Sequence, residues 1–196
     1  MVLLDRKKAI PTLIGDNNRF LIISGLAGTA KDIGFLTKES PNTFLFGGAM
    51  GGALPTSFGL ALSRPNDRVI CVSGDGDILM SMGCLATIAT IKPKNLIIIC
   101  VDNALYLETG GQTSHTGLGV NLDMIAKGCG FPITKTIVTE DELLEGKKIL
   151  DNFSGPAFIL LKVNKSSPPK YSRNWNASEE KLKFRKNLIN SIFIFD

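Results

Sequence analysis

Short apolar stretches of strand length recur along the chain, and helix-like sequence separates most of them. The stretches predicted as strands are 20–24, 43–46, 68–73, 95–101, 133–138 and 157–163. The segments predicted as helices are 29–37, 51–63, 78–91, 122–127 and 141–152. Residues 96–101 are apolar at every position, which is typical of a strand covered by helices on both faces. The pattern predicts a doubly wound fold, a three-layer α/β/α sandwich around a mostly parallel sheet of about six strands.

The composition narrows the class of protein. The chain has 196 residues, of which 44% are hydrophobic, enough for one buried core. The purely apolar run 96–101 is far shorter than the roughly 20 residues that a membrane span requires, so we expect a cytoplasmic protein without membrane contact. None of the four cysteines forms a C-x-x-C pair, which argues against a disulfide framework, a zinc site or an iron-sulfur cluster.

The positive charge is concentrated at the C-terminal end. Residues 165–196 hold seven Lys or Arg and three Asp or Glu, a balance equal to the net charge of +4 of the whole chain. Within 178–190, Leu182, Phe184 and Leu188 alternate with these charges at roughly helical spacing. This pattern favours a solvated amphipathic helix over a nucleic-acid-binding tail. We therefore expect one domain over 1–165 and a basic tail with a short helix over 166–196.

Glycine gathers in loops that follow the predicted strands, at 24–28, 46–52, 73–77 and 108–112. Ligands of doubly wound sheets bind outside the carboxyl ends of the strands. Loops rich in glycine let backbone amides approach an anion closely, and helix N-termini favour negative charge there. Four such loops predict an anion site at one edge of the sheet.

One motif points to a specific ligand. Gly74-Asp75-Gly76 directly follows a predicted strand, and 26 residues separate it from Asn103, which follows the next strand. A carboxylate and an amide oxygen at adjacent strand ends can both reach one hard cation, and Mg²⁺ prefers such ligands while leaving positions for phosphate. The motif predicts a site for Mg²⁺ and a diphosphate.

This arrangement resembles the signature of thiamine diphosphate enzymes, a GDG followed less than thirty residues later by Asn. The likeness covers nearly the whole chain and is strongest to the β subunit of sulfopyruvate decarboxylases and the matching half of phosphonopyruvate decarboxylases. The segments that carry it are 24–33, 47–62, 74–90, 95–116 and 155–163. One departure is Ala104, where relatives often have Gly after the Asn.

The resemblance implies roles for particular residues. Asp75, Asn103 and the carbonyl of Leu105 would bind Mg²⁺, and Asp77 with the amide of Gly76 would hold the diphosphate. The Gly48 carbonyl would accept from the 4′-amino group of the cofactor, and Met50 would wedge the cofactor into a bent shape. Further implied cofactor contacts are Ser24, Gly25, Ala49, Gly74, Tyr106 and Leu107. Glu108 and His115 are candidates for an acid/base and a proton donor.

The resemblance also implies an activity and a partner. These enzymes remove CO₂ from a short anionic 2-oxo acid, here 3-sulfopyruvate or 3-phosphonopyruvate, and release an aldehyde. The glutamate that activates the cofactor belongs to a pyrimidine-binding domain that we do not find in this chain. We therefore expect an α-type partner subunit and a heterotetramer or larger assembly. Lys170 and Arg173 are candidates to pair with the sulfonate, although solvated tail charges are the simpler interpretation.

Three other functions remain open. The β subunit of 2-oxoacid:ferredoxin oxidoreductases shares the GDGD and TGGQ segments, but its cluster cysteines are absent here. An acetolactate-synthase-like carboligase normally carries all its domains in one chain. A non-enzymatic scaffold is disfavoured because every metal-binding position is intact.

Overall fold

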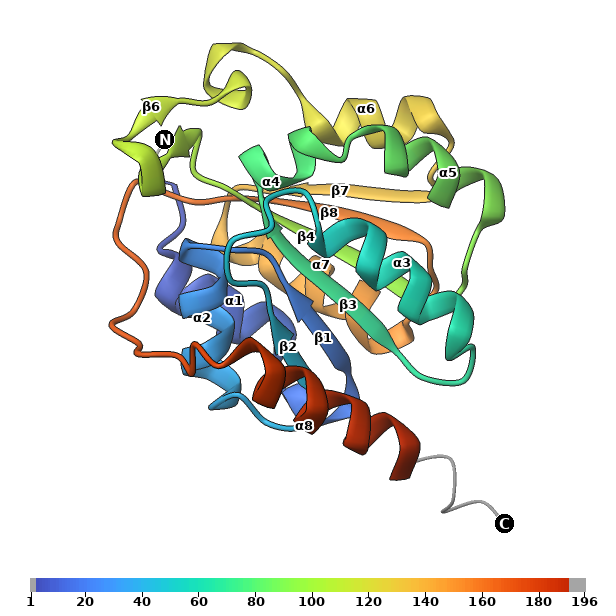
Figure 1. Cartoon of the computed structure of the whole chain (residues 1–196). Helices are drawn as coiled ribbons and strands as arrows, with labels where there is room; N and C mark the ends of the chain where they lie inside the picture. The colour runs from blue at the N-terminus through green and yellow to red at the C-terminus, as the bar shows by residue number, and fades with distance from the viewer. Residues whose placement is uncertain (1–2, 191–196) are drawn as a thin grey trace.

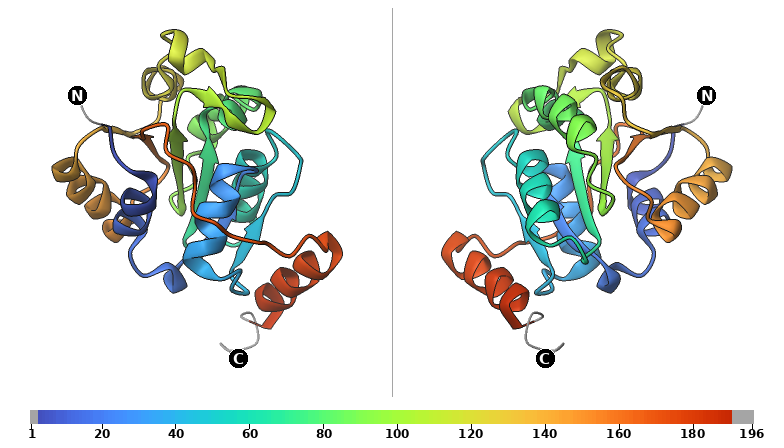
Figure 2. Two further views of the ribbon diagram at one scale, coloured as in Figure 1. Left: turned by 90° about the vertical axis from the view of Figure 1, so that its left-hand side faces the viewer. Right: turned by 90° about the vertical axis from the view of Figure 1, so that its right-hand side faces the viewer.

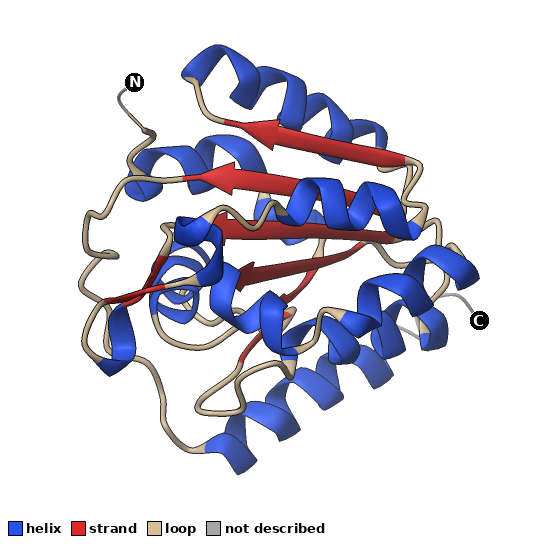
Figure 3. Cartoon of the chain, turned by 90° about the horizontal axis from the view of Figure 1, so that it is seen from above, coloured by secondary structure: helices blue, strands red, loops and turns tan. Residues whose placement is uncertain are grey.

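The computed structural model describes residues 3–190 and contains the predicted parallel sheet, whose six strands run in the order β2-β1-β3-β4-β8-β7. These strands are β1 (Leu21–Ser24), β2 (Thr43–Leu45), β3 (Val69–Gly74), β4 (Leu96–Asp102), β7 (Ile133–Ile137) and β8 (Ala157–Lys162). Each predicted strand overlaps one of them, and all five pairings are parallel. The arrowheads that are visible in Figure 3 point the same way. The prediction of the fold class is confirmed.

Helices cover both faces of the sheet, which makes the three layers visible in Figures 1 and 3. One face carries α1 (Arg6–Ile14), α2 (Gly28–Thr37) and α7 (Glu140–Asn152), and the other carries α3 (Ala53–Ser63), α5 (Gly83–Ile91) and α6 (Leu122–Cys129). Helix α7 starts as its sequence predicts, with Thr139 and Glu142 forming a reciprocal capping box. No helix within residues 3–190 is long and apolar enough to cross a membrane.

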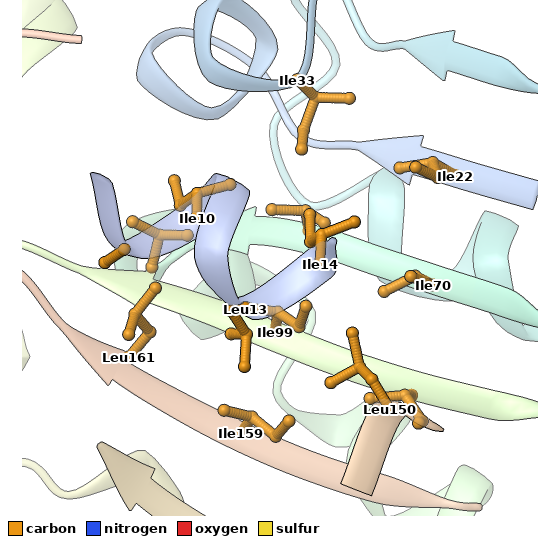
Figure 4. Packing of buried hydrophobic residues seen from close by; sticks show 14 of the residues in the cluster. Ile10, Leu13, Ile14, Ile22, Ile33, Ile70, Ile99, Leu150, Ile159 and Leu161 are labelled. Atoms are coloured by element: carbon orange, nitrogen blue, oxygen red, sulfur yellow. The ribbon is translucent and has the colours of Figure 1, made fainter. Parts of the chain in front are cut away.

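Strand β4 shows why an uninterrupted apolar sequence fits the centre of the sheet. Ile97 and Ile99 pack into the core beneath α1 and α7, whereas Ile98 and Cys100 pack into the core beneath α5 and α6. Figure 4 shows Ile99 among side chains from α1, α2 and α7. Because both faces are buried, both sets of alternate positions must be apolar.

The structure contains elements that the apolar pattern does not predict. Helix α1 begins at an N-cap, Asp5, whose side chain accepts a hydrogen bond from the Lys7 amide at 3.0 Å, and it contains Pro11. The predicted helix 78–91 is divided into α4 (Asp75–Met80) and α5, because Ser81 leaves the helical conformation before Gly83. Ser and Gly are weak helix formers, and this explains the position of the break. A short antiparallel hairpin, β5 (Leu105–Tyr106) with β6 (Gln112–Thr113), follows β4.

The basic C-terminal segment wraps around the outside of the domain and ends in α8 (Ala177–Asn190), beside β2 (Figure 2). A helix forms where the pattern predicts one, and Phe184 is buried on its inner side, whereas Leu182 is 57% exposed. Before the helix, the ring of Tyr171 packs against Gly34. A Cβ on Gly34 would lie only 2.6 Å from Tyr171 Cδ1. Arg173 donates to the carbonyls of Phe46 and Leu45 at 2.7 and 2.8 Å. Residues 191–196 of the predicted tail lie outside the described residues.

The strand order determines where a ligand can bind. From β1 the chain moves to β2 on one side, and then crosses back to β3 on the other side of β1. The carboxyl ends of β1 and β3 therefore flank a topological switch point, the usual ligand position in such sheets. The GDG motif lies at this edge, since β3 ends at Gly74.

Candidate cofactor site

A pocket of about 390 Å³ opens at the carboxyl edge of the sheet. Its walls come from the loops that follow β1, β2, β3 and β4, together with the first turn of α1. The lining residues are Arg6, Leu26, Ala27, Gly28, Thr29, Gly47, Gly48, Met50, Gly74, Asp75, Gly76, Asp77, Val101, Asn103, Leu105, Tyr106, Leu107, Glu108 and Thr109. The volume is within the range of small-molecule sites.

The carboxylate of Asp75 is held in a network of hydroxyl groups. Asp75 is the first residue of α4 and only 2% exposed. Its Oδ2 accepts from the hydroxyls of Ser114 at 2.5 Å and Thr116 at 3.0 Å. Burial raises the pKa of Asp75, and the hydrogen bond from Ser114 opposes that rise. With Oδ2 occupied by hydroxyl donors, Oδ1 is the oxygen available to a cation.

Asp102 extends this network behind the pocket. Its Oδ1 accepts from the Thr116 hydroxyl at 2.8 Å, and its Oδ2 accepts from Lys162 Nζ at 2.6 Å. A threonine hydroxyl carries a single hydrogen, so Thr116 can donate to Asp75 or to Asp102, but not to both at once. The two carboxylates therefore compete for one hydroxyl hydrogen, and Lys162 pairs with Asp102.

The turn after β4 brings Asn103 and Leu105 into the pocket wall. The Ala104 amide donates to Asp102 Oδ1 at 2.9 Å, and the Leu105 amide donates to Asn103 Oδ1 at 3.0 Å. Ala104 has a φ of 61°, in the left-handed region that favours glycine. This explains why Gly suits the position, and the two side-chain hydrogen bonds hold the turn in shape with Ala in its place.

Asp77 faces the protein rather than solvent. Its side chain accepts hydrogen bonds from the Ser73 hydroxyl and from the Gly51 amide. Gly25 packs against the same group, since a Cβ there would lie 2.6 Å from Ser73 Oγ and closer still to Asp77 Oδ2. Asp77 thus connects the loops that follow β1, β2 and β3, and its carboxylate oxygens are used within the protein.

The opposite side of the pocket is formed by Met50 and Tyr106, which meet over Gly76. A Cβ on Gly76 would lie 2.8 Å from Tyr106 Cδ1 and 3.2 Å from Met50 Cε. The Tyr106 hydroxyl is 3.2 Å from His115 Nδ1. Glycine is therefore required at the centre of the GDG motif so that these two side chains can approach the backbone.

Most of the predicted site residues come together. Eleven of them line the pocket: Gly48, Met50, Gly74, Asp75, Gly76, Asp77, Asn103, Leu105, Tyr106, Leu107 and Glu108. Four are not part of its lining among the described residues: Ser24, Gly25, Ala49 and His115. Ser24 and Gly25 are buried, and His115 contacts the lining residue Tyr106.

Sequence reasoning missed several contributors. Arg6 lines the pocket although it precedes every predicted strand, and Ser114 and Thr116 support Asp75 from a loop that carried no such prediction. Lys170 and Arg173 are absent from the described lining, and the guanidinium of Arg173 is bound to backbone carbonyls instead. The four cysteines are free thiols, of which Cys71 and Cys100 are buried and Cys84 and Cys129 are half-buried.

Comparison with known families decides the classification. Residues 27–161 match the family model described as "Thiamine pyrophosphate enzyme, C-terminal TPP binding domain". The chain belongs to this family of thiamine pyrophosphate enzymes. Thiamine pyrophosphate and thiamine diphosphate are the same compound, so the predicted family resemblance is confirmed.

Relatives of this thiamine pyrophosphate enzyme domain include the sulfopyruvate decarboxylase subunit beta of Methanocaldococcus jannaschii, which is 38% identical over 148 residues. The match covers 76% of this chain and 77% of the relative. The phosphonopyruvate decarboxylase of Streptomyces viridochromogenes is 29% identical over 170 residues, 83% of this chain and 42% of the relative. Among solved structures, benzoylformate decarboxylase from Polynucleobacter necessarius superposes with a TM-score of 0.68 at 21% identity, covering 85% of this chain and 34% of that one. The last likeness supports the fold, over about a third of the larger chain.

The residues present fit the cofactor that the family name implies. No group of three His, Cys, Asp or Glu side chains within residues 3–190 could hold a metal ion, so a cation here would need amide or carbonyl ligands as well. Asp75, Asn103 and Leu105 all line the pocket, and carboxylate, amide and carbonyl oxygens are ligand types that suit Mg²⁺ rather than a softer metal. A Cβ on Gly74 or Gly48 would meet nothing within 4 Å, so both glycines border open space.

Proposed function

We propose that this chain is the β-type subunit of a decarboxylase that depends on thiamine diphosphate and Mg²⁺ and acts on a short anionic 2-oxo acid. The substrate we favour is 3-sulfopyruvate, followed by 3-phosphonopyruvate. The observation that carries the proposal is that the buried residues Asp75 and Asn103 both line one pocket of about 390 Å³. The names of the relatives, which match most of this chain, support the choice of reaction and substrate.

In this proposal Asp75, Asn103 and the Leu105 carbonyl bind Mg²⁺, which neutralises part of the diphosphate charge. The amide of Gly76, in the first turn of α4, donates to the diphosphate at the positive end of that helix. Asp77 acts indirectly, because its hydrogen bonds with Ser73 and Gly51 hold the surrounding loops.

Thiamine diphosphate, when bound, supplies the nucleophilic carbon and the electron sink for the loss of CO₂. The residues of this chain then orient and seal the site. We assign Met50 the role of supporting the bent cofactor, and the Gly48 carbonyl that of accepting from its amino group. Glu108 lines the same pocket and is our candidate acid/base, and His115 would act on protons through its contact with Tyr106.

The proposal includes a pyrimidine-binding α-type subunit in a heterotetramer or a larger assembly. Apolar side chains are exposed around the mouth of the pocket: Met80, which packs against the Gly51 loop, is 64% exposed, and Trp175, which lies beside Gly47, is 72% exposed. Exposed apolar groups that border a pocket are typical of a surface that another protein covers. A partner there would close the site and supply the activating glutamate.

The test is release of CO₂ by the full chain assembled with this subunit, with 3-sulfopyruvate, 3-phosphonopyruvate, pyruvate and a branched-chain 2-oxo acid offered separately. We expect activity only with thiamine diphosphate and Mg²⁺, and a kcat/KM for one of the dianions at least ~10-fold above that for pyruvate, about 1.4 kcal/mol of discrimination. Asp75→Ala should abolish activity, whereas the matched control Asp141→Ala, an exposed carboxylate on α7, should not.

Different results would overturn different parts of the proposal. A tenfold preference for pyruvate or the branched-chain acid would contradict the substrate. Condensation of two pyruvate molecules would favour the carboligase, a reaction named for relatives that match 60% of this chain. Full activity of the single chain would contradict the need for a partner, and unchanged activity of Asp75→Ala would contradict the site itself.

A further inference from the structure

Arg6 presents a buried guanidinium to the pocket from the side of β1. It is 3% exposed and lies in the first turn of α1. Its Nε donates to both oxygens of Asp32 on α2, at 3.2 and 3.0 Å, and its Nη2 donates to one of them. A buried ion pair is weak support for stability on its own, because removing both charges from water costs about as much as their attraction returns. The position of the pair at the pocket suggests a second role.

The contact with Asp32 leaves one edge of the guanidinium free. A guanidinium has five N–H donors in a planar fork, and the Asp32 carboxylate covers only the edge formed by Nε and Nη2. The hydrogen bonds that the structure describes for the Arg6 side chain use Nε and Nη2, and none of them uses Nη1. Because Arg6 also lines the pocket, this second edge can donate to a ligand.

Gly28 allows the guanidinium to lie at the start of α2. A Cβ on Gly28 would lie 2.8 Å from Arg6 Nη2 and 3.0 Å from Nη1. Both nitrogens belong to the rigid, planar guanidinium, so a larger residue at position 28 would displace the whole group. Gly28 is the first residue of this ten-residue helix, so the guanidinium lies beside its free N-terminal amides. Arginine and helix terminus thus face the pocket from the same side.

The charges around the pocket define the ligand that this edge would bind. The described lining includes the acidic residues Asp75, Asp77 and Glu108, of which Asp77 uses its carboxylate within the protein, and Arg6 is its one Lys, Arg or His residue. Asp75 and the start of α4 face the switch point from β3, and Arg6 with the start of α2 faces it from β1. Arg6 and the first residues of α2 line the pocket on the side of β1, whereas Gly48 and Met50 lie on the β2 loop.

We propose that Arg6 binds the terminal phosphate of thiamine diphosphate from the β1 side of the pocket. Asp32 is the positioning residue that orients the guanidinium, and Gly28 provides the space. Guanidinium is well suited to two-point contact with a phosphate. The inference rests on the proposed thiamine diphosphate site and assigns it a contact that the GDG motif does not include.

The test measures the affinity of the assembled complex for thiamine diphosphate and for thiamine monophosphate by titration calorimetry, in excess Mg²⁺. Arg6→Gln should weaken thiamine diphosphate binding about 10- to 100-fold, as expected for loss of a charged hydrogen-bonding partner. Binding of the monophosphate, which lacks the terminal group, should change less than about threefold. Arg6→Lys keeps the charge and the pair with Asp32 but lacks the second donor edge, so it should show the same selective loss, reduced in size.

Arg19→Gln is the matched control, since Arg19 pairs with Asp151 at 2.5 Å on the outside of the domain. It should leave both affinities unchanged. Equal losses for both compounds in Arg6→Lys, or unchanged affinity with only a lower melting temperature, would overturn the inference in favour of a structural role. Unchanged cofactor affinity with a raised KM would assign Arg6 to the substrate instead. If the wild-type complex binds no thiamine diphosphate, the proposed function fails, and that result does not depend on any Arg6 variant.

Discussion

Replacing Thr116 by Val tests whether the hydroxyl network holds the buried carboxylates of the site. The change keeps the shape of the side chain and removes only the hydroxyl that lies 2.8 Å from Asp102 Oδ1, 3.0 Å from Asp75 Oδ2 and 2.9 Å from Ser114 Oγ. Loss of a hydrogen bond to a charged, buried group costs about 1.5–3 kcal/mol. For a domain of this size, that corresponds to a melting temperature lower by roughly 3–12 °C.

The assay is urea denaturation of the full chain, with and without Mg²⁺. Without the cation we expect the full loss of unfolding free energy. With Mg²⁺ the loss of unfolding free energy should be smaller. A cation bound to Asp75 reduces the repulsion between the Asp75 and Asp102 carboxylates, which the Thr116 hydroxyl no longer offsets. Thr113→Val is the control, since Thr113 is exposed in the same loop and is in neither carboxylate network. A loss below about 0.5 kcal/mol for Thr116→Val, the range of ordinary surface changes, would refute the reasoning.

Two further predictions concern glycines in the helices and cysteines in the central strands. Gly146→Ala in α7 should destabilise the fold by about 1–3 kcal/mol through overpacking, because the new Cβ would meet core side chains, among them Ile137 of β7. Gly59→Ala in α3, where nothing lies within 4 Å, should instead stabilise it by about 0.5–1 kcal/mol, and urea denaturation of the pair measures both signs. Burial raises the pKa of Cys71 to about 12 and that of Cys100 well above its usual value, so neither thiol should react with iodoacetamide at neutral pH until the protein unfolds. Peptide mass spectrometry checks this, and rapid labelling of either in the folded protein would contradict the buried position of the two strands.

Much of the fold could be predicted because its central strands obey a simple rule. A strand buried on both faces must be apolar throughout, and residues 96–101 show this without interruption. Helix α1 lacked such a signal: it starts with three basic residues and contains Pro11, and it forms because Ile10, Leu13 and Ile14 gain burial against the sheet. That gain is tertiary, so local propensity does not reveal it.

The candidate site could be predicted where chemistry and spacing coincide in one short motif, as for Asp75 and Asn103. Arg6 and Thr116 could not be predicted in this way, because neither belongs to the motif in sequence. Each reaches the pocket through the path of the folded chain, Arg6 by pairing with Asp32 across two helices and Thr116 by the return of a loop over α4. His115 is close to the motif in sequence but is not part of the described lining, and it contacts the lining residue Tyr106 through the tyrosine hydroxyl.

The most direct test of the central claim is a crystal structure of the assembled complex with thiamine diphosphate and Mn²⁺, a Mg²⁺ substitute whose position is given by its anomalous scattering. We predict one strong peak in this pocket, bound by Asp75 Oδ1, Asn103 Oδ1 and the Leu105 carbonyl at about 2.0–2.3 Å, with the diphosphate completing the shell. A peak bound by other residues, or a diphosphate away from the carboxyl ends of β3 and β4, would contradict the account.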